Sequence, residues 1–217
     1  MPDKLTVILA DGDFPVKDEP VSILKSAHRI ICCDGAAASL VKIGLEPDFI
    51  VGDLDSLSDE LKEKFADRLI RVREQETNDL TKAFNFCRSR NWNSICILGA
   101  TGKREDHTIG NLSLLADYSK TVPSIRIVTN YGTFFAVSSS CTILSKPGQQ
   151  ISIFALTNGV RVSSRGLKYP LDGLKLDYWW QATLNEAVEE SFELDCPDNN
   201  TLLLFQEHPK KRENSPE

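Results

Sequence analysis

Apolar residues in the first part of the chain, up to Val137, come in short runs that alternate with amphipathic segments. Each run is rich in Ile, Val and Leu at consecutive positions, which is the pattern of strands buried on both faces of a parallel sheet. The runs predict six strands, at Leu5–Ala10, Arg29–Cys33, Asp48–Val51, Leu69–Val72, Ser94–Leu98 and Ile125–Thr129.

Four segments between these runs have helical patterns. Ala36–Ile43 is followed by Gly44, a residue that favours the end of a helix. Ser56-Leu-Ser-Asp59 resembles a capping box, with apolar residues following at a spacing of four. A third helix is expected to begin just after Asn78, and a fourth to span His107–Tyr118. Strands alternating with helices predict an α/β fold with right-handed crossovers.

The pattern changes after Val137, where short apolar runs are broken by turn residues. Asn158-Gly159, between two such runs, is a hairpin signal. The segment Ala182–Glu190 has a weak helical pattern, and we favour a non-helical structure there. We therefore predict three parts: an α/β domain at 1–137, a small all-β domain at 138–207, and a charged, disordered tail at 208–217.

Composition narrows the class of protein. Hydrophobic residues make up 41% and charged residues 26% of the 217, as in ordinary globular domains. The net charge of −6 argues against a general affinity for nucleic acid, which depends on neutralising phosphates. No stretch approaches the ~18 apolar residues of a membrane span, and the run before Asp11 is too short for a secretory signal. The six cysteines form no CxxC pair and are expected to be reduced core residues of a cytoplasmic protein.

Polar clusters follow nearly every predicted strand of the first domain. Their carboxylates are Asp34, Asp53, Asp55, Asp79 and Asp106. Ligands of open α/β sheets bind outside the carboxyl ends of the strands, so we expect these side chains at one edge. Helix N-termini at the same edge would offer free N–H groups to an anion.

Several like charges at one edge are stable only when a cation neutralises them. Carboxylates suit Mg²⁺, which one or two of them typically hold together with phosphate oxygens and water. Asp53 and Asp55, two residues apart, could face one ion. Each Asp taken singly is more typical of a turn or a helix cap, whereas the whole set favours a ligand site.

Three other signals point to no site. Gly99-Ala-Thr-Gly-Lys103 has only two residues between its glycines, and Arg104 follows the lysine, so it is not a phosphate-binding P-loop. His107 stands alone at a helix start, where a structural role is more common. No Cys/His spacing fits a zinc site.

The motifs, in their order, resemble those of the thiamine pyrophosphokinase family over most of the chain. They are Asp34-Gly-Ala36, Pro47-Asp-Phe-Ile-Val-Gly-Asp-Leu-Asp-Ser56, Asn78-Asp79, Gly99-Ala-Thr-Gly-Lys-Arg-Glu-Asp-His-Thr-Ile-Gly-Asn-Leu112 and Gly166-Leu-Lys-Tyr169. Each piece is weak, but five in order are specific. The resemblance implies an α/β nucleotide-binding domain followed by a β-sandwich.

The resemblance also implies the reaction: transfer of the pyrophosphoryl unit of ATP to the hydroxyl of thiamine, with attack at the β-phosphorus and release of AMP. By position, Asp53, Asp55 and Asp79 would hold Mg²⁺, and Arg104 would neutralise the triphosphate. Asp106 would assist the metal or accept the hydroxyl proton. The implied ATP-binding residues are Asp34, Gly35, Thr101, Gly102, Arg104 and Asn130.

For thiamine, the resemblance implies contacts from Gln75, Tyr169 and Asn185, and a homodimer with thiamine bound where the subunits meet. Three features depart from the family pattern and bear on the thiamine half of the site. Asn78 stands where Thr is usual, Leu184 stands where Ser is usual, and 177–180 is richer in aromatic residues. A related amine or pterin acceptor therefore stays open.

Two other classes of function stay open beside the kinase. Asp53-Leu-Asp55 after a strand could be the nucleophile loop of a haloacid-dehalogenase-type phosphatase, but that loop normally follows the first strand and here two strands precede it. A nucleotide-sensing module would bind Mg-ATP without turnover, and Arg104 with Asp106 is more than binding requires.

Overall fold

The computed structural model describes residues 4–197 and 200–209, so the predicted tail at 208–217 lies almost entirely outside the described residues. The chain divides into two compact units, Met1–Asn130 and Tyr131–Glu217. This division comes earlier than the predicted boundary at 137, because Gly132–Val137 forms a strand of the second unit.

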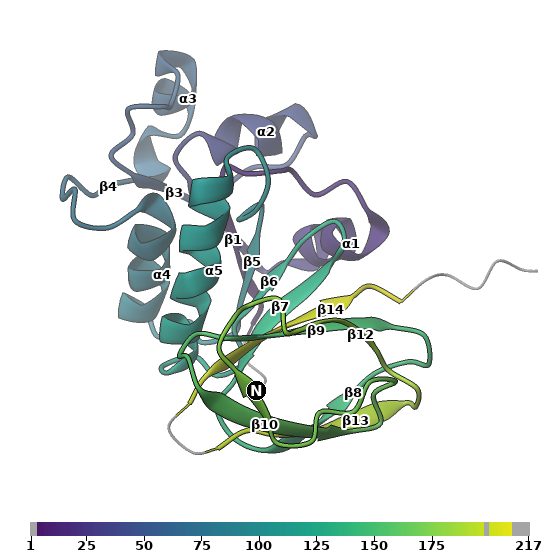
Figure 1. Ribbon diagram of the computed structural model, residues 1–217. Coiled ribbons are helices and arrows are strands. Elements are labelled where there is room, and N and C mark those ends of the chain that lie inside the picture. The colour runs from purple at the N-terminus through teal and green to yellow at the C-terminus, as the bar shows by residue number, and fades with distance from the viewer. Residues whose placement is uncertain (1–3, 198–199, 210–217) are drawn as a thin grey trace, which may run out of the picture. The chain divides into compact units, whose positions relative to one another are not determined.

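The first unit contains a six-stranded, wholly parallel sheet (Figure 1). Its strand order is β6-β5-β1-β2-β3-β4. The strands are β1 (Thr6–Leu9), β2 (Arg29–Cys33), β3 (Phe49–Gly52), β4 (Leu69–Arg71), β5 (Ile95–Leu98) and β6 (Arg126–Val128). All six predicted strands are confirmed, and the central ones are buried along their whole length because helices cover both faces.

The helices of this unit connect the strands. They are α1 (Asp18–Ser26), α2 (Ala36–Lys42), α3 (Asp59–Lys64), α4 (Asp79–Ser89) and α5 (Glu105–Ser119), with a short 3₁₀ turn at Ala66–Arg68. Helices α4 and α5 lie side by side (Figure 1), where the rings of Phe84 and Tyr118 stack at 4.1 Å between centroids.

Two local predictions for these helices need correction. Helix α1 was not predicted, although it buries Pro20 and Leu24 and packs Ile23 against the core. The capping box at Ser56 is also wrong. Helix α3 is capped by Ser58, whose hydroxyl accepts the Leu61 N–H at 3.4 Å. The Ser56 N–H donates instead to Asp34 Oδ2, and Ser56 does not cap the helix.

The second unit is built of antiparallel strands in two sheets, ordered β12-β9-β14-β7 and β11-β10-β13-β8. The strands are β7 (Gly132–Val137), β8 (Cys141–Leu144), β9 (Gln150–Ala155), β10 (Val160–Arg165), β11 (Leu174–Leu176), β12 (Ala182–Glu186), β13 (Ser191–Asp195) and β14 (Leu202–Glu207). The non-helical prediction for 182–190 is confirmed by β12. The hairpin at Asn158-Gly159 is wrong, because β9 and β10 belong to different sheets.

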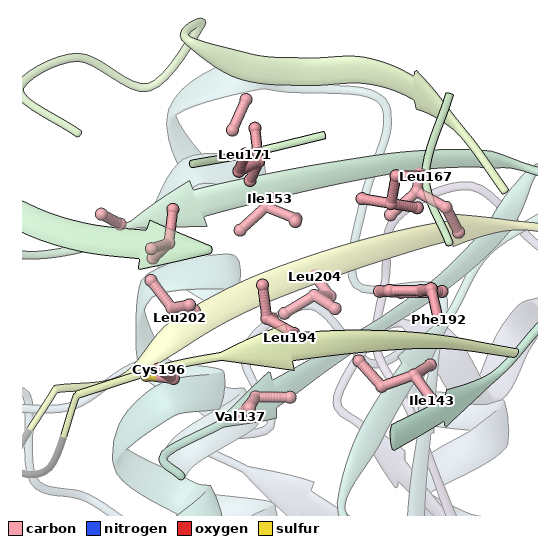
Figure 2. Packing of buried hydrophobic residues seen from close by; sticks show 14 of the residues in the cluster. Val137, Ile143, Ile153, Leu167, Leu171, Phe192, Leu194, Cys196, Leu202 and Leu204 are labelled. Carbon is pink, nitrogen blue, oxygen red and sulfur yellow. The ribbon is translucent and has the colours of Figure 1, made fainter. Parts of the chain in front are cut away.

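Alternating side chains of the two sheets pack against each other and form the core of this unit (Figure 2). Phe192 and Leu194 are buried there on either side of the exposed Glu193, and Leu202 and Leu204 are buried there on either side of Leu203, which is buried outside this core. This is the inward–outward alternation of a β-sandwich. Cys196 also packs in this core, and none of the six cysteines, all within the described residues, forms a disulfide, as predicted.

Candidate active site

A cleft of about 440 Å³ opens at the carboxyl edge of the parallel sheet, where the sequence predicted a ligand site. Residues of the loops after β1 to β5 and of the first turns of α4 and α5 line it. From the predicted set they include Asp34, Gly35, Asp53, Gln75, Asp79, Gly102 and Arg104. Asp55, Thr101, Asp106 and Asn130 do not line the cleft, and Tyr169 and Asn185 belong to the second unit.

Glycines let the loops after β1 and β5 approach closely at one side of the cleft. The Gly12 N–H donates to the Gly99 carbonyl at 2.6 Å, and a Cβ at Gly12 would lie 2.3 Å from the Thr101 carbonyl oxygen. Thr101 therefore acts through its main chain here, and any larger residue at position 12 would force the two loops apart.

Asp34 is the buried carboxylate of the cleft, with a residue exposure of 3%. Its backbone is in the left-handed region, at φ 36°, and its Oδ2 accepts the Ser56 N–H at 3.2 Å. Its other oxygen, Oδ1, is buried and has no hydrogen-bond partner among the described residues. Burial raises the pKa of Asp34, against the lowering effect of the Ser56 N–H, and the charges of Asp79 and Asp53 and a side-chain hydrogen bond with Asp53 raise it further.

Asp53 lies beside Asp34, but its pKa is shifted in the opposite direction. Its Oδ1 accepts the Asp55 N–H at 3.0 Å, and this bond lowers the pKa of Asp53. A side-chain hydrogen bond with Gln75 and the positive charge of Lys82 act in the same direction. Gln75, predicted to contact thiamine, thus touches a carboxylate predicted to hold the metal.

Asp55 does not join this group. Its side chain is 77% exposed, and its Oδ1 lies 3.7 Å from the Arg71 guanidinium. The two carboxylates of this tight turn therefore have different partners. The Asp55 main-chain N–H donates to the Asp53 carboxylate, whereas the Asp55 carboxylate lies near Arg71. The structure thus brings two of the three predicted metal ligands, Asp53 and Asp79, to the cleft and leaves the third outside it.

Helix α4 presents Asp79 to the cleft from its first turn. Asn78 caps the helix, with its Oδ1 accepting the Thr81 N–H at 2.9 Å. Lys82, one turn on, donates from Nζ to Asp79 Oδ1 at 3.1 Å, and only 3% of its side chain is exposed. Lys82 was not among the residues predicted for the site. Its signal was a lysine within the buried helical face of Leu80 and Ala83, since lysine is seldom fully buried without a partner.

Arg104 and Asp106 form a two-point ion pair at the start of α5. Arg104 Nε donates to Asp106 Oδ1 at 3.1 Å and Nη2 to Oδ2 at 2.5 Å, while the His107 N–H donates to Oδ1 at 2.9 Å. The Arg104 hydrogen bond is the main cause that lowers the pKa of Asp106 to about 2. Asp106 therefore stays ionised at neutral pH and orients the guanidinium, which itself lines the cleft.

Two of the predicted ligand residues have structural hydrogen bonds. The Asn130 side-chain oxygen accepts the N–H groups of Val16 and Lys17 at 2.8 and 3.1 Å, so it holds the loop after β1. In the second unit, Asn185 is buried and bonds both main-chain groups of Tyr169, at 3.1 and 2.7 Å. Asn185 thereby fixes the loop that displays the exposed ring of Tyr169.

The carboxylates fit a cation that takes further ligands from outside the protein. Across 4–197 and 200–209, no three His, Cys, Asp or Glu side chains form a complete metal-holding group. However, Gly52 lies between Asp34 and Asp79, and a Cβ there would be 3.1 Å from Asp34 Cβ and 3.4 Å from Asp79 Oδ1. Two or three close carboxylates, one with a buried unbonded oxygen, suit Mg²⁺ completed by phosphate oxygens and water.

Comparison with known proteins gives the chain a family. The model described as "Thiamin pyrophosphokinase, catalytic domain" matches residues 21–128, and the model described as "Thiamin pyrophosphokinase, substrate-binding domain" matches 132–205. The two matched regions together cover most of the chain and meet where the structure divides it.

Individual relatives agree with these matches. Thiamine pyrophosphokinase 1 of Oryza sativa subsp. japonica is 29% identical over 204 residues, which cover 76% of this chain and 73% of that protein. Thiamin pyrophosphokinase 1 of Caenorhabditis elegans is 25% identical over 181 residues, or 74% of each chain. The crystal structure of a thiamin pyrophosphokinase family protein from Enterococcus faecalis has the same fold, with a TM-score of 0.78 at 22% identity over 94% of this chain and 99% of that one.

Within the described residues, no helix is long and apolar enough to cross a membrane.

Proposed function

We propose that this chain, which belongs to the thiamine pyrophosphokinase family, transfers the pyrophosphoryl group of ATP to the hydroxyl group of thiamine. The products are thiamine diphosphate and AMP. One observation supports this site above others: Asp34, Asp53 and Asp79 meet Arg104 around a single cleft at the carboxyl edge of the sheet. That is where an α/β sheet binds a nucleotide.

The reaction exchanges one bond for another at the β-phosphorus. The thiamine oxygen forms a bond to this phosphorus, the bond from phosphorus to the oxygen shared with the α-phosphate breaks, and AMP leaves with that oxygen. The hydroxyl proton passes to a base or to solvent. Such transfers depend on alignment and charge neutralisation and need no covalent intermediate on the protein.

The chain supplies positive charge and orientation for this step. Arg104, oriented by Asp106, can bond two phosphate oxygens at once. The N-termini of α4 and α5 at the cleft add N–H groups that favour anions. With a pKa of about 2 beside Arg104, Asp106 is a weak proton acceptor, so we assign it the orienting role.

Asp53 and Asp79 would hold Mg²⁺ together with the nucleotide, as the resemblance implies, and Asp55 would join them only after turning away from Arg71. When bound, the cation neutralises phosphate oxygens and stabilises the charge that develops on AMP.

Gln75 and Tyr169 are the proposed thiamine contacts, and Asn185 acts by positioning Tyr169. A flat cationic ring fits an exposed aromatic side chain and nearby carboxylates. We further propose a homodimer, supported by exposed aromatic residues in the second unit, and a cytoplasmic location, supported by six cysteines that form no disulfide within the described residues.

One incubation tests the activity. Purified protein is mixed with Mg²⁺, ATP and thiamine, and the nucleotides and thiamine esters are separated at intervals. AMP that appears in step with thiamine diphosphate is the expected result. ADP in place of AMP would mean transfer of a single phosphoryl group. Intact ATP would contradict the proposal and lead to tests of pterin and other amine acceptors.

The family assignment disfavours the phosphatase and nucleotide-sensor hypotheses. The loop position agrees, since Asp53 follows the third strand of the chain and its Oδ1 is held by the Asp55 N–H.

A further inference from the structure

We infer that Asp34 is a direct ligand position of the cation site, facing the cation through Oδ1 beside Asp53 and Asp79. This places Asp34, which the resemblance assigns to ATP, in the position that the resemblance gives to Asp55. The inference rests on the proposed function, because it concerns the cation that the carboxylates of the cleft would hold.

Burial provides the first argument. Asp34 is 3% exposed, and its Oδ1 has no hydrogen-bond partner among the described residues, although the residue lines the cleft. A buried carboxylate oxygen that binds nothing is costly, because it has lost water without gaining a donor. The ligand side of the cleft is where a positive partner can approach it.

Charge balance provides the second argument. Asp34 and Asp79 flank Gly52, where a Cβ would lie 3.1 Å from Asp34 Cβ and 3.4 Å from Asp79 Oδ1, and Asp53 follows Gly52 in the chain. Within 4–197 and 200–209, Lys82 is the cation in ion-pair contact with any of the three, and its Nζ is bound to Asp79. One lysine leaves the three carboxylates with an excess of two negative charges when all are ionised, which matches one divalent cation.

The backbone around Asp34 is built to hold this orientation. Its φ of 36° is unusual for a residue other than glycine, and Asp and Asn tolerate it better than most. The Ser56 N–H, from the loop after β3, holds Oδ2 at 3.2 Å. Since Ser56 fixes one carboxylate oxygen, the other oxygen is left in a defined place without a donor.

Asp55 lacks each of these features. Its side chain is exposed, it does not line the cleft, and its nearest charged partner is Arg71 at 3.7 Å. Removing Asp55 should therefore disturb the cation less than removing Asp34, which is the opposite of what the motif alone implies.

The test compares Asp34→Asn with Asp55→Asn, and uses Asp117→Asn as a matched control. Asp117 is an exposed aspartate paired with Lys120 at 2.9 Å on α5, away from the cleft. Asparagine keeps the shape of Asp34, tolerates its backbone and still accepts the Ser56 N–H. Binding of Mn²⁺ alone is measured from the electron paramagnetic resonance signal of the free ion.

We expect Asp34→Asn to weaken Mn²⁺ binding by about tenfold or more, the scale expected for a lost contact at a metal site. Asp55→Asn should change it less, and Asp117→Asn should match the wild type. Without metal, Asp34→Asn should unfold at the same or a higher temperature, because it removes a buried charge. Mg²⁺ should raise the unfolding temperature of the wild type more than that of the variant.

Other outcomes are equally informative. Equal Mn²⁺ binding by wild type and Asp34→Asn would overturn the inference and leave the proposed function intact. A variant that unfolds without metal would give the Asp34 carboxylate a structural role, which also overturns it. A wild type that binds no Mn²⁺ would contradict the cation site of the proposed function itself.

Discussion

At the scale of single residues, the cleft pairs the charge of Lys82 with that of Asp79, and burying the lysine without this partner would be costly. Lys82 is buried because Asp79 neutralises it, and Asp79 faces the cleft because the cap on α4 places it in the first turn. Removing one partner of a buried ion pair leaves the other without compensation. Function and stability are therefore coupled at Asp79.

Asp79→Asn tests this coupling. It preserves side-chain volume but removes the charge shared by Lys82 and the proposed cation. Formation of AMP should fall by about 100-fold or more, beyond the effect typical of residues that only support a metal site. Circular dichroism should show a native fold with a lowered unfolding temperature. Full activity in this variant would refute the metal assignment of Asp79.

Buried thiols predict how stability changes at high pH. Burial raises the pKa of Cys87 to about 12 and that of Cys96 to about 11, from a usual value of 9.0. Because both folded-state values are raised, the thiols' contribution to stability is complete below pH 9 and is lost as pH rises toward 11–12. The urea midpoint should therefore fall over this range.

The same measurement on Cys87→Ala with Cys96→Ala provides the check. The double variant should start less stable, because two small core side chains are shortened, but its midpoint should depend less on pH above 9. An unchanged pH dependence would show that other groups, such as Tyr118, whose pKa is also raised by burial, dominate.

At the scale of elements, the N-terminus of α4 orients side chains of the cleft. Asn78, where the family pattern has Thr, accepts the Thr81 N–H and donates from Nδ2 to Asn111 Oδ1 at 3.1 Å. The cap thus links α4 to α5, and both helices carry cleft residues in their first turns.

Asn78→Ala should destabilise the protein by about 1 kcal/mol, the usual effect of losing a helix cap. Asn78→Thr, which restores the family residue and keeps a capping oxygen, should recover most of that loss. Urea unfolding measures both. Equal stability of the alanine and threonine variants would mean that the cap contributes little and that the Asn111 contact matters instead.

The elements also show what the sequence could and could not predict. Consecutive Ile, Val and Leu identified the central parallel strands, because burial on both faces removes alternation. The edge strand β4 was found from Leu69 and Ile70, although none of its three residues is fully buried. Placing Asp34, Asp53 and Asp79 together required only that parallel strands end at one edge. Periodicity carries no such information about side-chain direction within a loop, so the outward turn of Asp55 was not predictable from it. Lys82 differs, because it lies on the buried face of α4 and the helical pattern there did contain its signal.

At the scale of the whole molecule, the second unit has exposed aromatic residues that are not part of its hydrophobic core. Gln181 accepts the N–H groups of Asp177 and Tyr178, each at 2.7 Å, and so holds the loop after β11 in a defined shape. Trp179 packs edge-on against Phe154 at 6.2 Å, whereas Tyr178 and Trp180 are 67% and 72% exposed. Ordered, exposed aromatic residues are typical of protein interfaces.

We therefore expect Trp180 to lie in the proposed homodimer interface. Trp180→Ala should raise the dimer dissociation constant by about tenfold or more, because a central tryptophan commonly contributes over 1 kcal/mol to binding. Size-exclusion chromatography with light scattering, over a dilution series, measures it. Leu144→Ala is the control, since Leu144 is equally apolar and 81% exposed on β8. A monomeric wild type, or equal dissociation constants for the two variants, would contradict the assignment and leave the aromatic loop free to contact substrate instead.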